Sequence, residues 1–173
     1  GVTTGLRDLD RKTGGLQKSD LVILAGRPSM GKTALATNIA FNAAHAYNDT
    51  ANKEGSAVAF FSLEMSSEQL ATRLLGEHSR VPSDKIRRGE IKQDDFSKFL
   101  EATKILSRAP LYIDDTPGLS VSGLRTRARR LKRTVPHLGL IVIDYLQLLH
   151  GSSRRDENRV QEVSEITRGL KAL

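Results

Sequence analysis

Short apolar runs alternate along this chain with longer stretches in which apolar residues recur every three or four positions. The runs predict strands and the periodic stretches predict helices, an order typical of α/β domains built round a mostly parallel sheet. We expect strands at residues 21–25, 57–62, 111–113 and 138–145. We expect helices at residues 33–47, 67–78, 93–107 and 120–133, and a last helix with Val160, Val163, Ile166 and Leu170 turned inward.

Two of these helices carry further local signals. Ser66 followed three residues later by Gln69 predicts a capping box at the start of helix 67–78. Helix 93–107 is amphipathic, and its expected buried face consists of Phe96, Phe99, Leu100, Thr103 and Leu106. The strand at residues 21–25 is apolar throughout, which favours a strand covered on both faces.

Length and composition narrow the class of protein. A chain of 173 residues with 38% hydrophobic and 27% charged residues predicts one globular domain. No apolar run approaches the roughly 20 residues that cross a bilayer, so we expect a soluble, cytoplasmic protein. The chain has no cysteine, and its four histidines are scattered, so transition-metal chemistry is not expected.

A phosphate-binding loop is the strongest chemical signal. The pattern G-x-x-x-x-G-K-[ST] lies between an expected strand and an expected helix. In such a loop, backbone N–H groups surround phosphate oxygens, the lysine reaches the β and γ phosphates, and the final hydroxyl binds Mg²⁺. The residues are Gly26, Arg27, Pro28, Ser29, Met30, Gly31, Lys32 and Thr33.

Acidic residues at strand ends are candidates for the rest of the site. A second Mg²⁺ ligand is expected at the carboxyl end of a neighbouring strand, where Asp144 is favoured over Asp114 and Asp115 because its strand is the longer apolar run. Asp114 and Asp115 are expected to cap the turn into helix 120–133. Glu64, just after strand 57–62, is a candidate to activate the attacking water, with an ordinary surface carboxylate as the alternative.

The net charge of +7 is concentrated in one segment. Six of the nine residues from Arg125 to Arg133 are basic, and no acidic residue occurs between Thr116 and Ile143. A solvated helix face is the favoured interpretation, with phosphate binding as the alternative. Arg154, Arg155 and Arg159 flank a polar loop after the fourth strand, and we consider them candidates for contact with nucleic acid.

Taken together, these motifs resemble the RecA-like motor domain of bacterial replicative helicases of the DnaB type. The resemblance covers nearly the whole chain. It rests on the segments Gly1-Val2-Thr3-Thr4-Gly5 with Leu9-Asp10 and Gly14-Gly15-Leu16, the phosphate loop, Phe61-Ser62-Leu63-Glu64-Met65, Tyr112-Ile113-Asp114-Asp115, Ile143-Asp144-Tyr145-Leu146-Gln147 and Glu162-Val163-Ser164-Glu165-Ile166. It implies a RecA-like P-loop fold in which Glu64 and Lys32 are catalytic and Thr33 and Asp144 hold the metal.

The resemblance also implies a function and partners. It implies an ATP hydrolase that uses ATP and Mg²⁺ to move 5′ to 3′ on single-stranded DNA and to unwind duplex at the replication fork. The expected assembly is a homohexameric ring that contacts primase and a helicase loader. Residues 1–173 would then be an incomplete motor domain. The sensor residue, the arginine finger and the main DNA-binding loop would lie beyond Leu173, and the collar domain and linker would precede Gly1.

Two other functions remain open from the residues. One is a P-loop phosphotransferase, whose activity would ignore DNA. The other is a nucleotide-gated scaffold of the RadA or KaiC type, which the segments at residues 61–65 and 143–147 fit less well.

Overall fold

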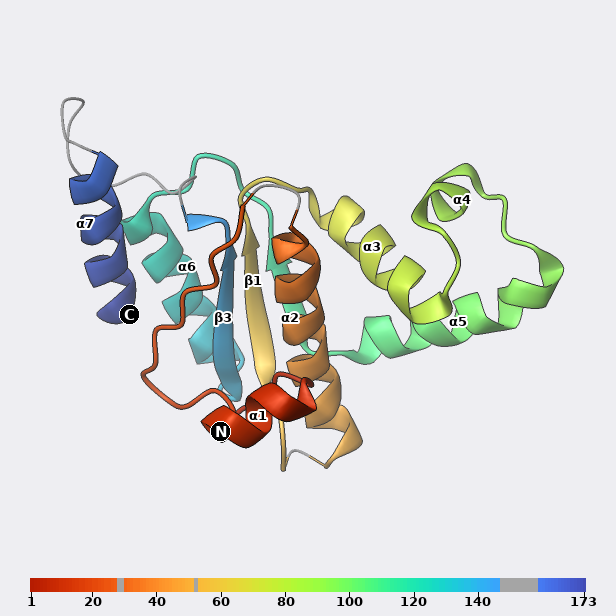
Figure 1. Ribbon diagram of the computed structural model, residues 1–173, viewed down its shortest axis with the longest axis horizontal. Helices are drawn as coiled ribbons and strands as arrows, with labels where there is room; N and C mark the ends of the chain where they lie inside the picture. The colour runs from red at the N-terminus through yellow and green to blue at the C-terminus, as the bar shows by residue number, and fades with distance from the viewer. Residues whose placement is uncertain (28–29, 52, 147–158) are drawn as a thin grey trace.

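The centre of the molecule is a three-stranded parallel sheet. The computed structural model describes residues 1–27, 30–51, 53–146 and 159–173. Strand β1 (Ala57–Ser62) lies between β2 (Leu111–Asp114) and β3 (Leu138–Asp144) and is parallel to both (Figure 1). All six residues of β1 are buried, as expected for a strand with a neighbour on each edge and a helical layer on each face.

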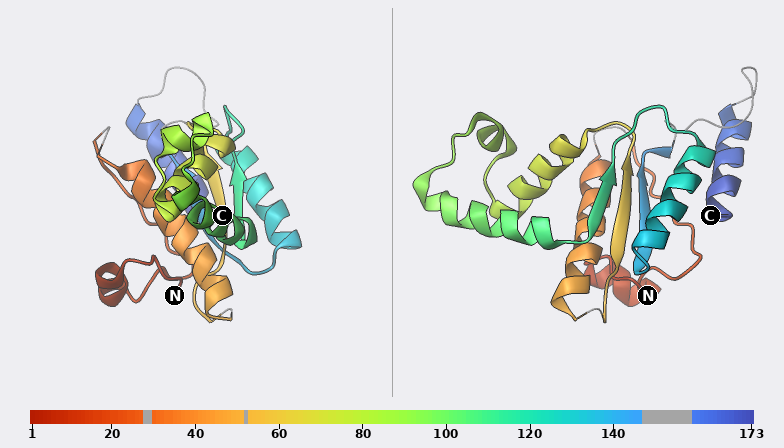
Figure 2. Two further views of the ribbon diagram at one scale, coloured as in Figure 1. Left: turned by 90° about the vertical axis from the view of Figure 1, so that its right-hand side faces the viewer. Right: turned by 180° about the vertical axis from the view of Figure 1, so that it is seen from behind.

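Helices cover both faces of the sheet. Helix α2 (Lys32–Asp49) lies on one face, and α6 (Val121–Thr134) and α7 (Arg159–Lys171) lie on the other (Figures 1 and 2). Alternate residues of β1 serve the two layers, because successive side chains of a strand point to opposite faces. Val58 and Phe60 pack with α2, whereas Ala57, Ala59 and Phe61 share a cluster with α6 and α7.

The strand expected at residues 21–25 is not formed, and that prediction is wrong. The segment joins no ladder among the described strands, and Leu21, Val22, Ile23 and Leu24 are 37%, 65%, 61% and 44% exposed. A strand needs a neighbouring backbone as well as apolar side chains, and this segment pairs with neither of the sheet's outer edges, on β2 and β3. An apolar run shows a preference for burial and does not specify its pairing partner.

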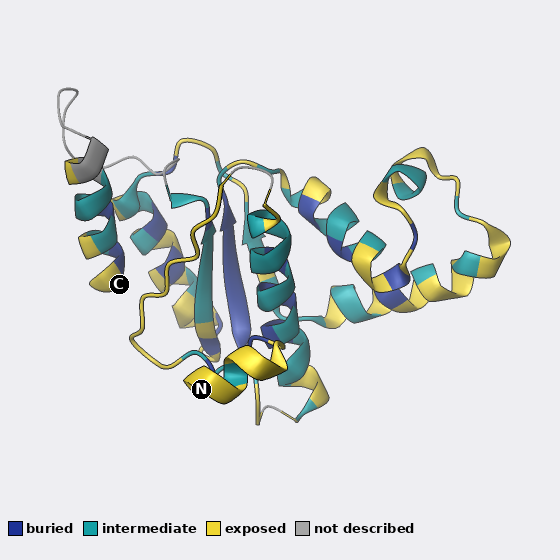
Figure 3. Ribbon diagram, in the orientation of Figure 1, coloured by how far each residue is buried: buried dark blue, intermediate teal, exposed yellow. Residues whose placement is uncertain are grey.

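A helical arm extends from one side of the sheet. It consists of α3 (Ser67–Ser79), α4 (Ser83–Arg88) and α5 (Gln93–Arg108), and α5 packs against α3 (Figures 1 and 3). The face expected to be buried on α5 is largely not buried, since Phe96 is 51% and Leu100 is 44% exposed and Ala102 is the buried residue of the helix. One neighbouring helix covers a narrower stripe than a sheet would, so the outer part of the apolar face stays in solvent.

The Asp10 carboxylate organises the N-terminal segment. Asp10, in α1 (Arg7–Thr13), accepts hydrogen bonds from the Thr4 backbone N–H at 3.0 Å and the Thr4 hydroxyl at 2.7 Å, and another from the Thr3 hydroxyl. Burial opposes ionisation of Asp10, but these hydrogen bonds outweigh it and lower its pKa. The Asn42 side chain on α2 donates to the Thr4 carbonyl at 3.1 Å, which ties the segment to the main helical layer.

The remaining expected elements are confirmed to within a residue or two. The capping box at Ser66 and Gln69 is present, and Ile166 and Leu170 are buried on α7 as expected. The short helices α1 and α4 were not predicted. None of the helices in the described ranges combines the length and the apolar character that crossing a bilayer requires.

Candidate functional site

The start of α2 offers backbone donors to a ligand. Gly31 precedes the helix in the left-handed conformation, at φ 77°, and no described side chain caps the first turn, which also has no acidic residue. A helix start in this state carries unpaired N–H groups and the positive end of the helix dipole, and both favour an anion. Pro28 and Ser29 of the predicted loop lie outside the described residues.

The lysine of the loop contacts the end of β3. The Lys32 ammonium lies 4.4 Å from the centroid of the Tyr145 ring, within the range of a cation–π interaction. Tyr145 directly follows Asp144, the last residue of β3. The predicted phosphate loop and the predicted metal-side aspartate, 112 positions apart in sequence, are therefore brought to one place. The sequence predicts no role for Tyr145, although this residue lies in the segment at residues 143–147 that carries the family resemblance.

Asp144 is a buried carboxylate at the end of β3. Its residue is 3% exposed, and its Oδ2 atom is buried with no hydrogen-bond partner among the described residues. Its backbone is fixed, since it pairs with Ser62 and its carbonyl accepts a hydrogen bond from Leu63 N–H at 2.8 Å. An unpartnered carboxylate oxygen is costly, and a Mg²⁺ ion or its water would satisfy it. The residues present therefore fit the metal that the phosphate loop implies.

Glu64 lies at the same edge of the sheet. It is exposed and comes two residues after the end of β1, next to the Leu63 backbone that pairs with Asp144. Ser62 donates from its hydroxyl to the Met65 carbonyl at 2.6 Å, which fixes the turn that carries Glu64. An exposed carboxylate beside a buried one provides a base that water can reach.

Asp114 and Asp115 have structural roles. Asp114 accepts from Thr116 N–H at 3.0 Å and pairs with Arg127 of α6 at 2.9 Å. Burial disfavours the charged form of Asp114, but the Thr116 hydrogen bonds and Arg127 lower its pKa overall. Asp115 accepts from Ser67 N–H at 2.8 Å, so it caps α3 and not the turn into α6. The expected cap is thus correct for Asp114 alone.

The predicted DNA-contacting arginines are mostly outside the described residues. Arg154 and Arg155 lie outside the described residues. Arg159 is the first residue of α7, and the position of its side chain is not described. Within the described ranges, no group of three or more His, Cys, Asp or Glu residues could hold a metal ion. A Mg²⁺ site that uses one carboxylate, one hydroxyl and nucleotide phosphates does not need such a group.

Comparison with known proteins identifies the family. The model of the DnaB-like helicase C terminal domain matches residues 1–173. The chain belongs to this family. Among the curated relatives of this DnaB-like domain, the replicative DNA helicase DnaB of Rickettsia prowazekii (strain Madrid E) is 52% identical over 176 residues, and that of Geobacillus stearothermophilus is 51% identical over 173. The comparison covers 100% of this chain and 36% of each relative, so the DnaB-like domain described here spans about a third of their length.

Solved structures confirm the fold of this DnaB-like domain. A structure described as an ATPase domain superposes with a TM-score of 0.88 at 34% identity, over 99% of this chain and 58% of that one. The structure of a DnaB-like replicative helicase and its interactions with primase gives a TM-score of 0.87 at 34% identity, over 99% of this chain and 40% of that one. The predicted RecA-like α/β class is confirmed.

Proposed function

We propose that this domain is the ATP-hydrolysing motor of a replicative DNA helicase, which couples hydrolysis to movement on single-stranded DNA and to duplex unwinding. The observation that carries the proposal is the contact between Lys32 and Tyr145, because it brings the phosphate loop to the strand end that bears Asp144. The similarity to replicative DNA helicases over the whole chain supports the same function.

Each site residue has a proposed role. Lys32 and the backbone at residues 29–33 bind the nucleotide phosphates, Thr33 and Asp144 hold Mg²⁺ directly or through its water, and Glu64 accepts a proton from the attacking water. Mg²⁺, when bound, supplies charge neutralisation between the β and γ phosphates. The Tyr145 ring holds Lys32 before nucleotide arrives. Arg154, Arg155 and Arg159 remain candidates for contact with the translocated strand.

The proposed assembly is a homohexameric ring. In ring motors of this kind, a neighbouring subunit supplies the arginine that stabilises charge in the transition state, so turnover should depend on oligomerisation. A solved relative described with its primase interactions supports primase as a partner of the whole protein, and a helicase loader is proposed with it.

ATP turnover with and without single-stranded DNA tests this function. We expect DNA to stimulate turnover in the wild type, and Glu64→Gln to bind a fluorescent ATP analogue normally while losing turnover. Glu68→Gln, an exposed glutamate on α3, is the matched control and should retain turnover. Turnover that ignores DNA would favour the phosphotransferase or scaffold alternatives, and near wild-type turnover in Glu64→Gln would reject its role as the base.

A further inference from the structure

A pocket lies at the amino ends of the strands, at the opposite edge of the sheet from Asp144. This is the lower edge of the sheet in Figure 1. Strand β1 has six residues at about 3.3 Å each, so this edge lies about 20 Å from the proposed nucleotide site. We call the pocket the amino-edge pocket. It has a volume of about 610 Å³, and its lining includes Leu16, Lys18, Ser56, Lys132, His137 and Gly139.

The Ser56 hydroxyl in this pocket has no partner. Ser56 is 5% exposed, and its Oγ atom is buried with no hydrogen-bond partner among the described residues. The neighbouring Gly139 has no side chain to shield it, since a Cβ atom there would lie 2.9 Å from the Ser56 Cβ and 3.2 Å from its Oγ. A buried hydroxyl without a partner is costly, and a ligand oxygen beside Gly139 would accept its hydrogen bond.

The start of β3 is irregular at the same place. The register of the ladder with β1 shifts there, from the pair Ala57 and Leu138 to the pair Val58 and Leu140. Gly139 is the residue left over by this shift, and it is exposed. A glycine that interrupts a ladder allows another group to approach the backbone closely. The irregularity therefore opens the sheet edge where the Ser56 hydroxyl lies.

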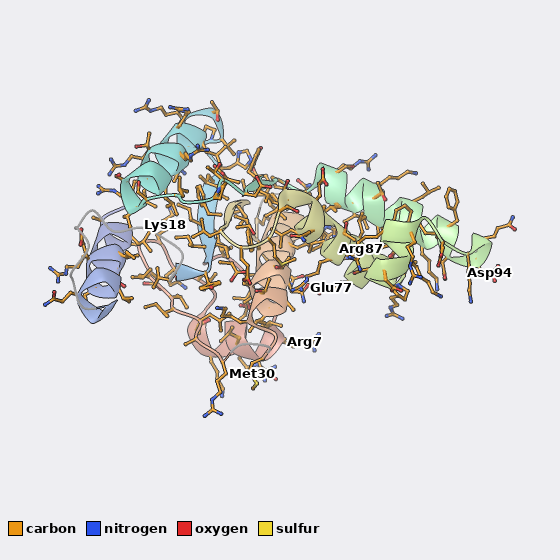
Figure 4. The ribbon with its side chains drawn as sticks, turned by 90° about the horizontal axis from the view of Figure 1, so that it is seen from above. Arg7, Lys18, Met30, Glu77, Arg87 and Asp94 are labelled. Atoms are coloured by element: carbon orange, nitrogen blue, oxygen red, sulfur yellow. The ribbon has the colours of Figure 1, made fainter. Side chains whose placement is uncertain are left out.

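The amino-edge pocket is lined by basic side chains. These are Lys18, Lys132 and His137, and none of the described lining residues is Asp or Glu. The Lys132 ammonium donates to the carbonyl oxygens of Pro136 and Leu138 at 2.6 and 2.7 Å, which fixes its position. Lys18 lies on the side of the molecule with α6 and α7, away from the arm (Figure 4). Among the described residues, neither lysine forms an ion pair, so their charges are not neutralised by a carboxylate.

We propose that the amino-edge pocket binds a phosphomonoester of a small organic molecule. A lysine binds phosphate as a point charge, whereas the paired donors that match a planar carboxylate come from arginine, which this lining lacks. Two lysine charges suit a dianion, and the Ser56 hydroxyl adds a neutral donor. This inference is independent of the proposed motor function.

The remaining lining suits the organic part of such a ligand. Val2, Leu16 and Pro136 supply apolar surface beside the cations. The N-terminal wall is held by a two-way bridge, in which Val2 and Leu16 each donate a backbone N–H to the other's carbonyl at 2.8 Å. A volume of about 610 Å³ lies within the roughly 300–1,000 Å³ of sites for small molecules.

Nuclear magnetic resonance of the histidine rings tests the proposal. His137 lines the pocket, and its ring stacks on Tyr47 with the centroids 4.7 Å apart, so its C2–H resonance reports on this site. The variant His137→Gln assigns that resonance. The probe is phenyl phosphate, titrated at constant ionic strength and at pH 7.5, where a phosphomonoester is mostly a dianion. The His137 resonance should move to saturation, and that of His78 on α3 should not move.

Variants of the lining should weaken this binding. Ser56→Ala removes a hydrogen bond to a charged group, so the Kd should rise about 10-fold. Tm should not fall, because the deleted hydroxyl has no partner among the described residues. Lys18→Gln should raise the Kd by up to about 5-fold. Lys104→Gln is its matched control, since it removes the charge of an exposed lysine on the arm, and it should bind like the wild type.

The phosphate loop also attracts phosphate, so the two sites must be separated. Lys32→Ala should leave the response of the His137 resonance unchanged, because Lys32 lies at the other edge of the sheet. Conversely, Ser56→Ala should bind a fluorescent ATP analogue like the wild type. A failure of the proposed motor function is therefore distinguishable from a failure of this pocket.

Several results would overturn the proposal. A His137 resonance that does not move, or an equal Kd in the wild type and Ser56→Ala, would show that the pocket does not hold phosphate through that hydroxyl. A response abolished by Lys32→Ala would assign the phenyl phosphate to the phosphate loop alone. Inorganic phosphate and benzoate should both bind more weakly than phenyl phosphate. Equal binding of inorganic phosphate would contradict the organic part of the ligand, and equal binding of benzoate would contradict the choice of phosphate over carboxylate.

Discussion

Asp144 is expected to lower the stability of the domain in the absence of ligand. Its Oδ2 atom is buried without a partner among the described residues, and a buried acceptor in that state costs about 1–3 kcal/mol. Asp144→Asn keeps the size of the side chain and removes the carboxylate. Because the new amide is also polar, we expect only the lower end of that range, a gain of about 1 kcal/mol. For a chain of this length, that raises Tm by about 2–4 °C.

Mg²⁺ and ATP should reverse the order of stability of the wild type and Asp144→Asn. Ligand at 100 times its Kd stabilises the wild type by about 2.7 kcal/mol. Asp144→Asn should lose most of that effect, because the substituted residue is the proposed metal-side ligand. The variant is then the more stable protein alone and the less stable protein with saturating Mg²⁺ and ATP.

Thermal unfolding followed by far-UV circular dichroism measures this reversal, and it suits a chain that has no tryptophan. Asp114→Asn is the matched control at the end of β2. It removes the pair with Arg127, worth about 0.2–1 kcal/mol at a partly exposed site, so Tm should fall with or without ligand. A Tm for ligand-free Asp144→Asn that is 2 °C or more below the wild type would refute the reasoning, as would equal stabilisation of both proteins by Mg²⁺ and ATP.

Three further outcomes are expected. Tyr145→Leu removes a cation–π contact worth about 0.5–1 kcal/mol and frees the Lys32 ammonium. A fluorescent ATP analogue should then bind about 2–5-fold more tightly, because binding no longer has to break that contact. Weaker binding would show instead that the ring positions the lysine for phosphate. The depressed pKa of Asp114 contributes stability that is complete above the ordinary value of 3.8 and is lost as pH falls through the lower pKa of the folded state. In urea unfolding measured over a series of pH values, Asp114→Asn should therefore flatten the fall in the free energy of unfolding at acid pH. Gly55 and Gly89 both have positive φ, but only at Gly55 would a Cβ atom meet backbone, within 2.2 Å of the Ala43 carbonyl oxygen. In urea unfolding, Gly89→Ala should therefore lower the free energy of unfolding by roughly 1–2 kcal/mol, and Gly55→Ala should lower it by clearly more.

The sequence predicts those parts of the fold that depend on local pattern. The strand at β1 and the capping box at Ser66 follow from a bounded apolar run and from a fixed spacing of polar residues. The predictions that are wrong, the strand at residues 21–25 and the buried face of α5, depend on contacts with elements distant in sequence. Whether residues 21–25 pair with a strand, and how much of α5 a neighbour covers, depends on which surfaces remain available after the sheet and the arm have packed.

The candidate site shows the same division. Motif spacing gives Lys32 and Asp144, and their convergence through Tyr145 is a tertiary contact that the pattern does not reveal. Asp115 is instructive, because its strand-end position suggested a cap for the following turn. In the structure, the Asp115 carboxylate instead accepts a hydrogen bond from Ser67 N–H at the start of α3, 48 positions earlier in the chain.

The ladder between β1 and β3 fixes the backbone on one side of the proposed site. Ser62 pairs with Asp144, and Leu63 N–H donates to the Asp144 carbonyl, so the backbones that carry Glu64 and Asp144 are joined across the central strand pair. Core strand pairs open at close to the full cost of unfolding. Lys32 instead reaches Tyr145 from a separate helical layer. Exchange of the Tyr145 ring for a phosphate as the partner of Lys32 would then leave the backbones that carry Glu64 and Asp144 in place, so any adjustment to the nucleotide would fall on the Lys32 side of the proposed site.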